Sequence, residues 1–138
     1  MIVASGLKSI SFKETYEKCN LPVITLYNDT YPLNFIIDSG ASICVINKSV
    51  LKYLHYTEVK DKNVSVMTAS EDVEGEAVKI QINDETNIEE VTFLVMNLDG
   101  QFKSISEQDG VIIHGILGNN FLEHKSALLN YSSFEISW

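Results

Sequence analysis

An apolar run of β-forming residues that ends in an acid is the feature that most restricts how this chain can fold. Residues 33–37 read Leu-Asn-Phe-Ile-Ile and lead directly into Asp38, Ser39 and Gly40. A carboxylate at the end of so apolar a strand has to be desolvated or paired, whereas glycine permits a tight turn and serine can hydrogen-bond locally. Taken alone, the pattern also fits an Asx-type turn that ends a hairpin strand. The run therefore predicts a strand that delivers Asp38 to a turn, with the chemical role of the acid still open.

Most of the remaining sequence reads as short β-strands. Residues 22–27 are rich in β-forming side chains and, with residues 33–37, predict a hairpin. Further strands are predicted for residues 64–68, 76–82, 91–98, 111–113, 127–130 and 134–138. Helical signals occur after Asn47, read as an N-cap, and at residues 120–123. Because no repeat or linker marks a boundary, residues 1–138 are expected to form a single all-β domain, a barrel or sandwich with one or two short helices.

Charge and composition exclude several classes of function. The formal net charge is −9, from 19 acidic and 10 basic residues without a basic cluster, so no binding to nucleic acid is expected. No stretch approaches the ~20 apolar residues of a membrane span, so none is expected. Residues 1–11 lack the pattern of a signal peptide, which favours the cytoplasm unless such a peptide has been removed. Cys19 and Cys44 form no C-x-x-C pair, and His114 has no second histidine four residues on, so no metal site is expected.

A second motif lies far downstream, and the two motifs are more informative together than the first one alone. Residues 115–118 read Gly-Ile-Leu-Gly and lead into the short helical signal near residue 120. An apolar-apolar-Asp-Ser-Gly-Ala element followed by an apolar-apolar-Gly element is the two-part signature of retropepsin-like aspartic proteases. The chain resembles that family over residues 21–138. The resemblance implies an all-β acid-protease barrel that hydrolyses peptide bonds without a cofactor or metal.

The resemblance also implies a role for individual residues. Asp38 would be the catalytic carboxylate, Ser39 would brace the paired loops, and Gly40 would contact the substrate through its backbone. Residues 64–78 fall where the family has its flap hairpin. The peptide is expected to contact an apolar channel and the flap tip, formed by Ala41, Ser42, Ile43, Val45, Ile46, Thr68, Ala69, Ser70 and Ile116.

This chemistry needs two aspartates, and the chain has a single D-[ST]-G motif. Two carboxylates held close together cannot both ionise, so they share a proton; one then acts as a base on a water while the other donates to the scissile carbonyl. Asp99-Gly100 and Asp109-Gly110 lack the hydroxyl residue and the preceding apolar strand, so both are read as turns. The second Asp38 is therefore expected from another copy of the chain in a homodimer with two-fold symmetry.

Three details follow from the comparison with the family. The flap tip at residues 67–72 contains no glycine, although family flaps usually do. Ser42 and Asn119 stand where retroviral members have an acid and an arginine, which predicts that the two side chains lie close enough to hydrogen-bond, directly or through a water. The final strand, residues 134–138, alternates apolar and polar residues and is expected in the sheet through which family members dimerise.

Two rival interpretations remain in view. A catalytically inactive module of the same fold, used for dimerisation or peptide binding, would also carry the strand pattern, and the unusual flap is its sequence support. A cysteine protease would use Cys44 with one of the histidines, but Cys44 lies in an apolar run without a local signature and reads as a buried structural thiol.

Overall fold

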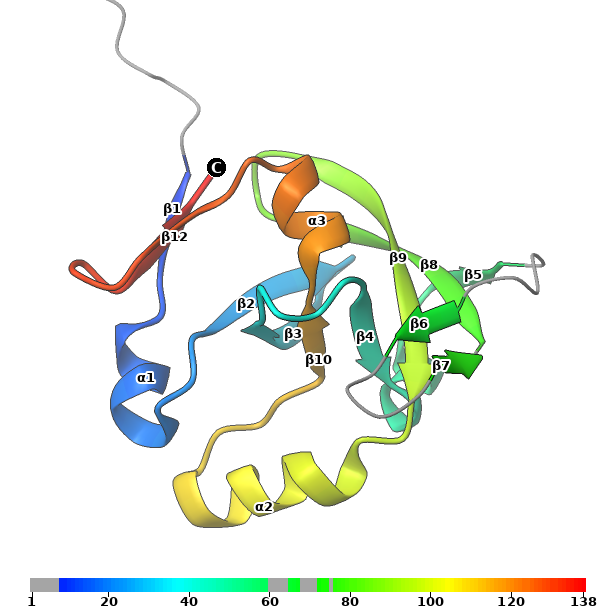
Figure 1. Ribbon diagram of the computed structural model, residues 1–138, viewed down its shortest axis with the longest axis horizontal. Coiled ribbons are helices and arrows are strands. Elements are labelled where there is room, and N and C mark those ends of the chain that lie inside the picture. The colour runs from blue at the N-terminus through cyan, green and yellow to red at the C-terminus, as the bar shows by residue number, and fades with distance from the viewer. Residues whose placement is uncertain (1–7, 60–64, 68–71, 75) are drawn as a thin grey trace, which may run out of the picture.

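A closed β-barrel forms the centre of the computed structural model, which describes residues 8–59, 65–67, 72–74 and 76–138 (Figure 1). In spatial order its strands are β2 (Val23–Asn28), β3 (Tyr31–Ile37), β10 (Gly115–Leu117), β4 (Cys44–Asn47), β9 (Ile88–Met96) and β8 (Ala77–Asn83). Pairing of Tyr27 with Asn83 closes the barrel between β2 and β8, and β5 (Tyr56–Glu58) extends the sheet beside β8. The pairs β3–β10 and β4–β9 are parallel. The predicted mostly-β barrel is confirmed.

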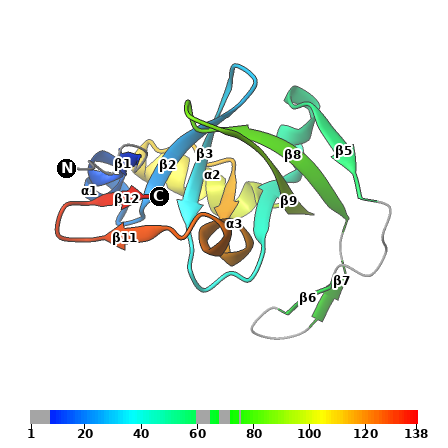
Figure 2. The same cartoon turned by 90° about the horizontal axis from the view of Figure 1, so that it is seen from above.

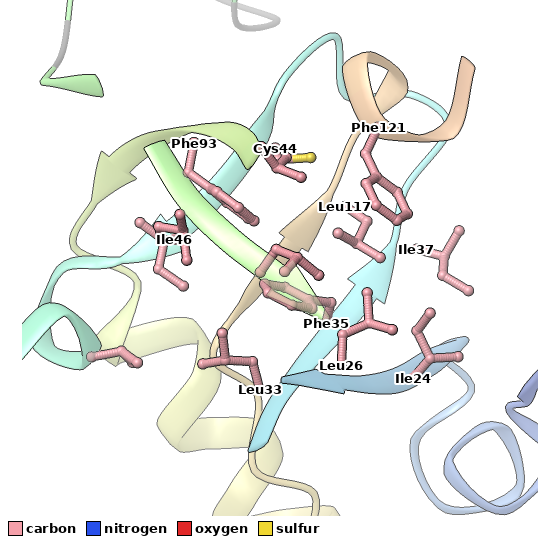
Figure 3. Packing of buried hydrophobic residues seen from close by; sticks show 14 of the residues in the cluster. Ile24, Leu26, Leu33, Phe35, Ile37, Cys44, Ile46, Phe93, Leu117 and Phe121 are labelled. Atoms are coloured by element: carbon pink, nitrogen blue, oxygen red, sulfur yellow. The ribbon is translucent and has the colours of Figure 1, made fainter. Parts of the chain in front are cut away.

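The barrel core follows from the two-residue period of the strands. In β3, Leu33, Phe35 and Ile37 are buried and point into the barrel, while the residues between them are more exposed. Phe35 stacks on Phe93 of β9 with ring centroids 5.6 Å apart. Leu117 of β10 joins them in the same cluster (Figure 3). The predicted hairpin of β2 and β3 therefore supplies one wall of the core.

A second apolar cluster lies between the sheet and a helix that the sequence did not predict. Helix α2 (Asp99–Asp109) packs Phe102 against Val45 and Leu94, whose side chains leave the sheet on the face opposite the barrel core. The reading of Asp99-Gly100 as a turn is wrong, because both residues begin α2. Asp109 is the last residue of α2 and Gly110 ends the helix in the left-handed conformation, so the second pair forms the helix end and not the separate turn that was predicted.

The two ends of the described chain form a separate small sheet beside the barrel (Figure 1). Strand β12 (Glu135–Ser137) is its centre, flanked by β1 (Ser9–Ser11) on one side and β11 (Leu128–Asn130) on the other, and both pairings are antiparallel. Helix α1 (Lys13–Cys19), also unpredicted, connects β1 to the barrel. Strands β11 and β12 match the two runs predicted at the end of the sequence.

Several local predictions change in detail. The helical signal after Asn47 becomes a 3-10 helix, η1 (Lys48–Tyr53), and the Asn47 side chain accepts from the N–H of Leu98 instead of capping it. The second signal becomes α3 (Asn119–His124). Residues 111–113 are not a strand, although Val111 and Ile113 are buried in the second cluster. Strands β6 (Ser65–Met67) and β7 (Asp72–Glu74) pair as a hairpin in the predicted flap region.

Of the helices described, none has the length and apolar character needed to cross a membrane.

Candidate active site

Asp38 lies directly after the last residue of β3, where β3 runs parallel to β10. Its backbone N–H donates to the carbonyl of Leu117 at 3.0 Å, which continues the ladder between the two strands. The chain then turns: the N–H of Gly40 donates to Asp38 Oδ1 at 2.9 Å, and the N–H of Ala41 donates to the Asp38 carbonyl at 3.1 Å. The Asp38 side chain is exposed, so the expectation that it is desolvated or paired is not met within one chain. The turn is of the Asx type, and it fixes the carboxylate at its tip.

Gly118 and Asn119, at the start of α3, hold this turn in place. A Cβ on Gly118 would lie 2.6 Å from the carbonyl oxygen of Ile43 and 2.9 Å from that of Ala41, so only glycine allows the two segments to approach so closely. The N–H of Asn119 donates to the Ala41 carbonyl at 2.8 Å, and its Nδ2 donates to the Ser39 carbonyl at 2.8 Å. The two sequence motifs therefore form one structural unit.

Among the contacts of the described chain there is no direct hydrogen bond between the side chains of Ser42 and Asn119. Ser42 is exposed, and the Asn119 amide is committed to Ser39. Asn120, which the sequence did not single out, makes a related contact: its Oδ1 accepts from the N–H of Cys44 at 2.8 Å and its Nδ2 donates to the carbonyl of Thr92 at 2.9 Å. Its position directly after Asn119 in the second motif was the only sequence signal for it.

Cys44 is buried inside this unit and has the environment of a structural thiol. The N–H of Gly118 donates to its Sγ at 3.3 Å. Burial disfavours the thiolate and raises the pKa of Cys44 to about 11, so the side chain stays protonated at neutral pH. The cysteine-protease interpretation does not fit a buried, protonated thiol.

The residues predicted to line an apolar channel divide between two faces of the sheet. Ile43 and Ile116 are half-buried and pack on the second cluster, and Val45 is buried within it. Ile46 is 0% exposed and points into the barrel core, so its assignment to the channel is wrong. The reason is the two-residue period of β4, which sends neighbouring side chains to opposite faces, both of them buried.

The remaining predicted contacts belong to the loop and the flap. Ala41 is half-buried and Ser42 exposed on the loop between β3 and β4. Figure 2 shows this loop on the same side of the molecule as the hairpin of β6 and β7. The predicted flap-tip contacts Thr68, Ala69 and Ser70 lie outside the residues that the structure describes.

The described residues offer no cluster of three or more ligating side chains that could hold a metal ion. His114 has a structural role instead: its Nδ1 accepts from the N–H of Asn34 at 2.9 Å. Burial lowers the pKa of His114, which favours the neutral ring that can accept this bond.

Comparison with known proteins places this geometry in a family. A family profile described as aspartyl protease matches residues 23–121, from β2 to α3, and so spans both motifs. The chain belongs to the aspartyl protease family. This confirms the resemblance found in the sequence. Both the Asp38 turn and the Gly118 segment lie within the matched residues.

Solved structures show which fold the aspartyl protease chain adopts. The EIAV protease in complex with the inhibitor HBY-793 is 21% identical and superposes with a TM-score of 0.57, over 80% of this chain and 92% of the viral one. A retropepsin-like aspartic protease from Rickettsia conorii is 15% identical with a TM-score of 0.57, over 96% of this chain and 90% of the other. The comparison with curated proteins finds no match. The retropepsin-like barrel predicted from the sequence is confirmed.

Proposed function

We propose that this chain is an aspartic endopeptidase whose active form is a homodimer, with residues 1–138 acting as one domain and one protomer. The observation that carries the proposal is the exposed Asp38 carboxylate on a turn braced by Leu117 and Asn119. The chain is also a member of the aspartyl protease family. A fixed turn holds the carboxylate in one orientation, which acid–base catalysis on a bound peptide requires.

In the proposed dimer, the two Asp38 carboxyl groups face each other across the two-fold axis and share one proton. The ionised carboxylate takes a proton from a water whose oxygen attacks the carbonyl carbon of the peptide bond, and the protonated carboxyl group gives its proton to the carbonyl oxygen. The resulting diol then collapses. One hydroxyl returns its proton to the ionised carboxylate, the C–N bond breaks, and the other carboxyl group protonates the nitrogen. The pair ends with one shared proton, as it began.

The two residues after Asp38 have supporting roles in the proposal. The Ser39 hydroxyl braces the partner loop, and the Gly40 backbone contacts the peptide, as the family resemblance implies. Asn119 donates a hydrogen bond to the Ser39 carbonyl, so the backbone that carries the Ser39 hydroxyl is held in position. The apolar cluster around Ile43 and Ile116 supports a preference for apolar side chains beside the cleaved bond.

The test is the loss of peptide hydrolysis in Asp38→Asn. This change removes the acid–base pair while preserving side-chain volume, so cleavage of a mixed peptide library, read by mass spectrometry, is expected to fall to background. Asp109→Asn, at the end of α2, is the matched control and should cleave like the wild type. Equal turnover by the Asp38→Asn protein would refute the proposal. A folded wild-type dimer that cleaves nothing would support the alternative of an inactive peptide-binding module.

A further inference from the structure

Lys125 is a buried cation at the end of α3, the helix whose first residues hold the Asp38 turn. Its side chain is only 7% exposed. Its Nζ lies 2.6 Å from Glu89 Oε1 and 3.5 Å from Asp84 Oδ2, and both carboxylates belong to the hairpin of β8 and β9. Lysine is almost never buried unless it is paired. The place of this side chain is therefore set by two partners from another part of the fold.

The Asp84 carboxylate is itself held firmly. Its Oδ1 accepts from the backbone N–H of Thr86 at 2.8 Å and from that of Asn87 at 2.7 Å. Its Oδ2 accepts from the indole N–H of Trp138 at 2.8 Å. A carboxylate with three donors has little freedom to follow its partner. It therefore defines a fixed point for the end of α3.

Two aromatic rings complete the surroundings of the lysine. Its Nζ lies 5.9 Å from the ring centroid of Phe121 and 5.7 Å from that of Trp138, within the range of a cation–π attraction. The two rings meet edge-on, with centroids 5.5 Å apart. Phe121 is buried, and Figure 3 shows its ring extending from α3 toward Leu117 and Ile37. Helix α3 is thus held by apolar packing in its middle and by charge at its end.

Backbone hydrogen bonds connect the lysine to the start of the same helix. The N–H groups of Phe121 and Leu122 both donate to the Gly118 carbonyl at 3.1 Å, and the N–H of Lys125 donates to the Phe121 carbonyl at 3.0 Å. The helix has six residues, so its two ends are only roughly 9 Å apart. Since so short a helix moves as one piece, a shift at Lys125 is carried to Gly118.

We propose that Lys125 is a positioning residue for the Asp38 turn: its pairing with the two carboxylates sets the place of α3, and α3 in turn presents Gly118 and Asn119 to the turn. A buried ion pair is not needed for stability alone, because apolar residues of similar volume often stabilise a core equally well. What the charges add is direction, since they fit one arrangement of partners, whereas apolar contacts tolerate several. The effect on catalysis rests on the proposed function, and the effect on the turn does not.

Three variants separate positioning from general stabilisation. Lys125→Met keeps most of the apolar stem and removes the charge. Glu89→Gln removes one of the two negative charges and preserves the shape of the side chain. Val50→Ala is the control: it truncates a buried residue of η1, outside the charged cluster and outside α3, and so destabilises the fold without changing either.

Amide hydrogen exchange of the full chain, measured by NMR, reports on the turn directly. The N–H of Asp38 donates to Leu117 and that of Asn119 to Ala41, so both amides are protected only while the turn and α3 are in place. The reference is the ladder between β2 and β3, around Leu26 and Leu33. In Lys125→Met, exchange at Asp38 and Asn119 should rise about tenfold more than in this ladder, and in Glu89→Gln about threefold more.

The control variant decides how a loss of protection is interpreted. Val50→Ala should raise exchange at the turn and in the ladder by the same factor, because it lowers only global stability. If Lys125→Met and Glu89→Gln give that same uniform pattern, or no change at the turn, the proposed role of Lys125 is wrong. Should Lys125→Met fail to fold, Glu89→Gln decides the question by the same comparison.

Kinetics then test the consequence for catalysis, at a chain concentration where the dimer is complete. In Glu89→Gln, kcat should fall about threefold with KM unchanged, because the turn moves while the surfaces that bind the peptide remain. Lys125→Arg keeps the charge and should retain most of kcat, and Val50→Ala should retain all of it. Unchanged kcat in both Lys125→Met and Glu89→Gln would overturn the positioning role. A wild type that cleaves no peptide removes the proposed function, while the exchange comparison still decides the role of Lys125.

Discussion

The side-chain amide of Asn119 donates a hydrogen bond to the backbone carbonyl of Ser39, with 2.8 Å between nitrogen and oxygen. The same residue donates its backbone N–H to the Ala41 carbonyl, so α3 holds the Asp38 turn at two points. In the retroviral members of the family, the residue at the position of Asn119 is an arginine that pairs with an acid. Here a neutral amide holds the loop through its backbone, and no buried charge needs a partner.

Asn119→Ala should therefore lower activity without breaking the dimer. One hydrogen bond of this kind contributes roughly 0.5–1.5 kcal/mol, so we expect kcat/KM to fall by about three- to tenfold. Asn97→Ala, which removes an amide that accepts from the N–H of Asp99, is the control and should retain wild-type kcat/KM. Steady-state kinetics on a cleavable peptide, with sedimentation to verify the dimer, makes the comparison. Unchanged kinetics in the Asn119 variant would show that the bond does not position the turn.

Gly118→Ala should distort the Asp38 loop far more than an alanine introduced at an unhindered glycine. The added Cβ would lie 2.6 Å from the backbone of Ile43, and neither segment can move without breaking the bonds around Asp38. We expect a loss of about 1–3 kcal/mol in the free energy of unfolding and a loss of activity. Gly100→Ala is the matched control: nothing lies within 4 Å of its Cβ, and alanine in α2 should stabilise by roughly 0.5–1 kcal/mol. Urea unfolding of both variants measures this, and equal stabilities would contradict the expected clash.

Specific activity should fall on dilution, since each protomer brings one Asp38. Below the dimer dissociation constant, the concentration of active species rises with the square of total chain concentration. Activity per chain is measured over a thousandfold dilution beside the oligomeric state. Constant activity per chain in a demonstrably monomeric sample would exclude the dimeric mechanism.

Asp84 should make the stability of the fold depend on pH in the acid range. Burial by itself would raise the pKa of Asp84, but hydrogen bonds from Thr86, Asn87 and Trp138 outweigh it and hold the pKa well below its ordinary value. Lys125 Nζ lies 3.5 Å from Asp84 Oδ2. Since the pKa is lower in the folded chain than in the unfolded one, the ionised carboxylate stabilises the fold fully above the unfolded pKa of about 3.9. Its contribution is lost as the pH falls toward the folded pKa.

Asp84→Asn should accordingly lower the free energy of unfolding by about 3 kcal/mol at pH 7, the range for breaking a buried charge pair. The difference from the wild type should stay constant down to about pH 4 and then shrink by up to about 1.4 kcal/mol for each further pH unit. Urea unfolding at pH 7, 5 and 3 measures the difference. A gap that is as large at pH 3 as at pH 7 would mean that Asp84 is not held ionised by its neighbours.

Some features outside the site were visible in the sequence only in hindsight. Leu98, the N-cap of α2, stands at helical spacing from Phe102 and Ile105 within the helix, but the Asp99-Gly100 pair at its start suggested a turn. Residues 111–113 have β-forming side chains, yet they form no strand, and the buried Val111 and Ile113 belong to the same apolar cluster as Phe102 of α2. In both places tertiary packing overrode a local preference.

The elements whose signal is local could be predicted from the sequence. The alternation of Leu33, Phe35 and Ile37 fixed the inner face of β3, and the two motifs fixed the Asp38 turn and the glycine that approaches it. Three features became visible only in the folded chain: Ile46 faces the core, Asn119 binds Ser39, and β12 lies between β1 and β11. A period of two says which side chains share a face, but when both faces are buried it cannot say which face meets the core. Strand order depends on pairings between residues far apart in the chain, which no local pattern records.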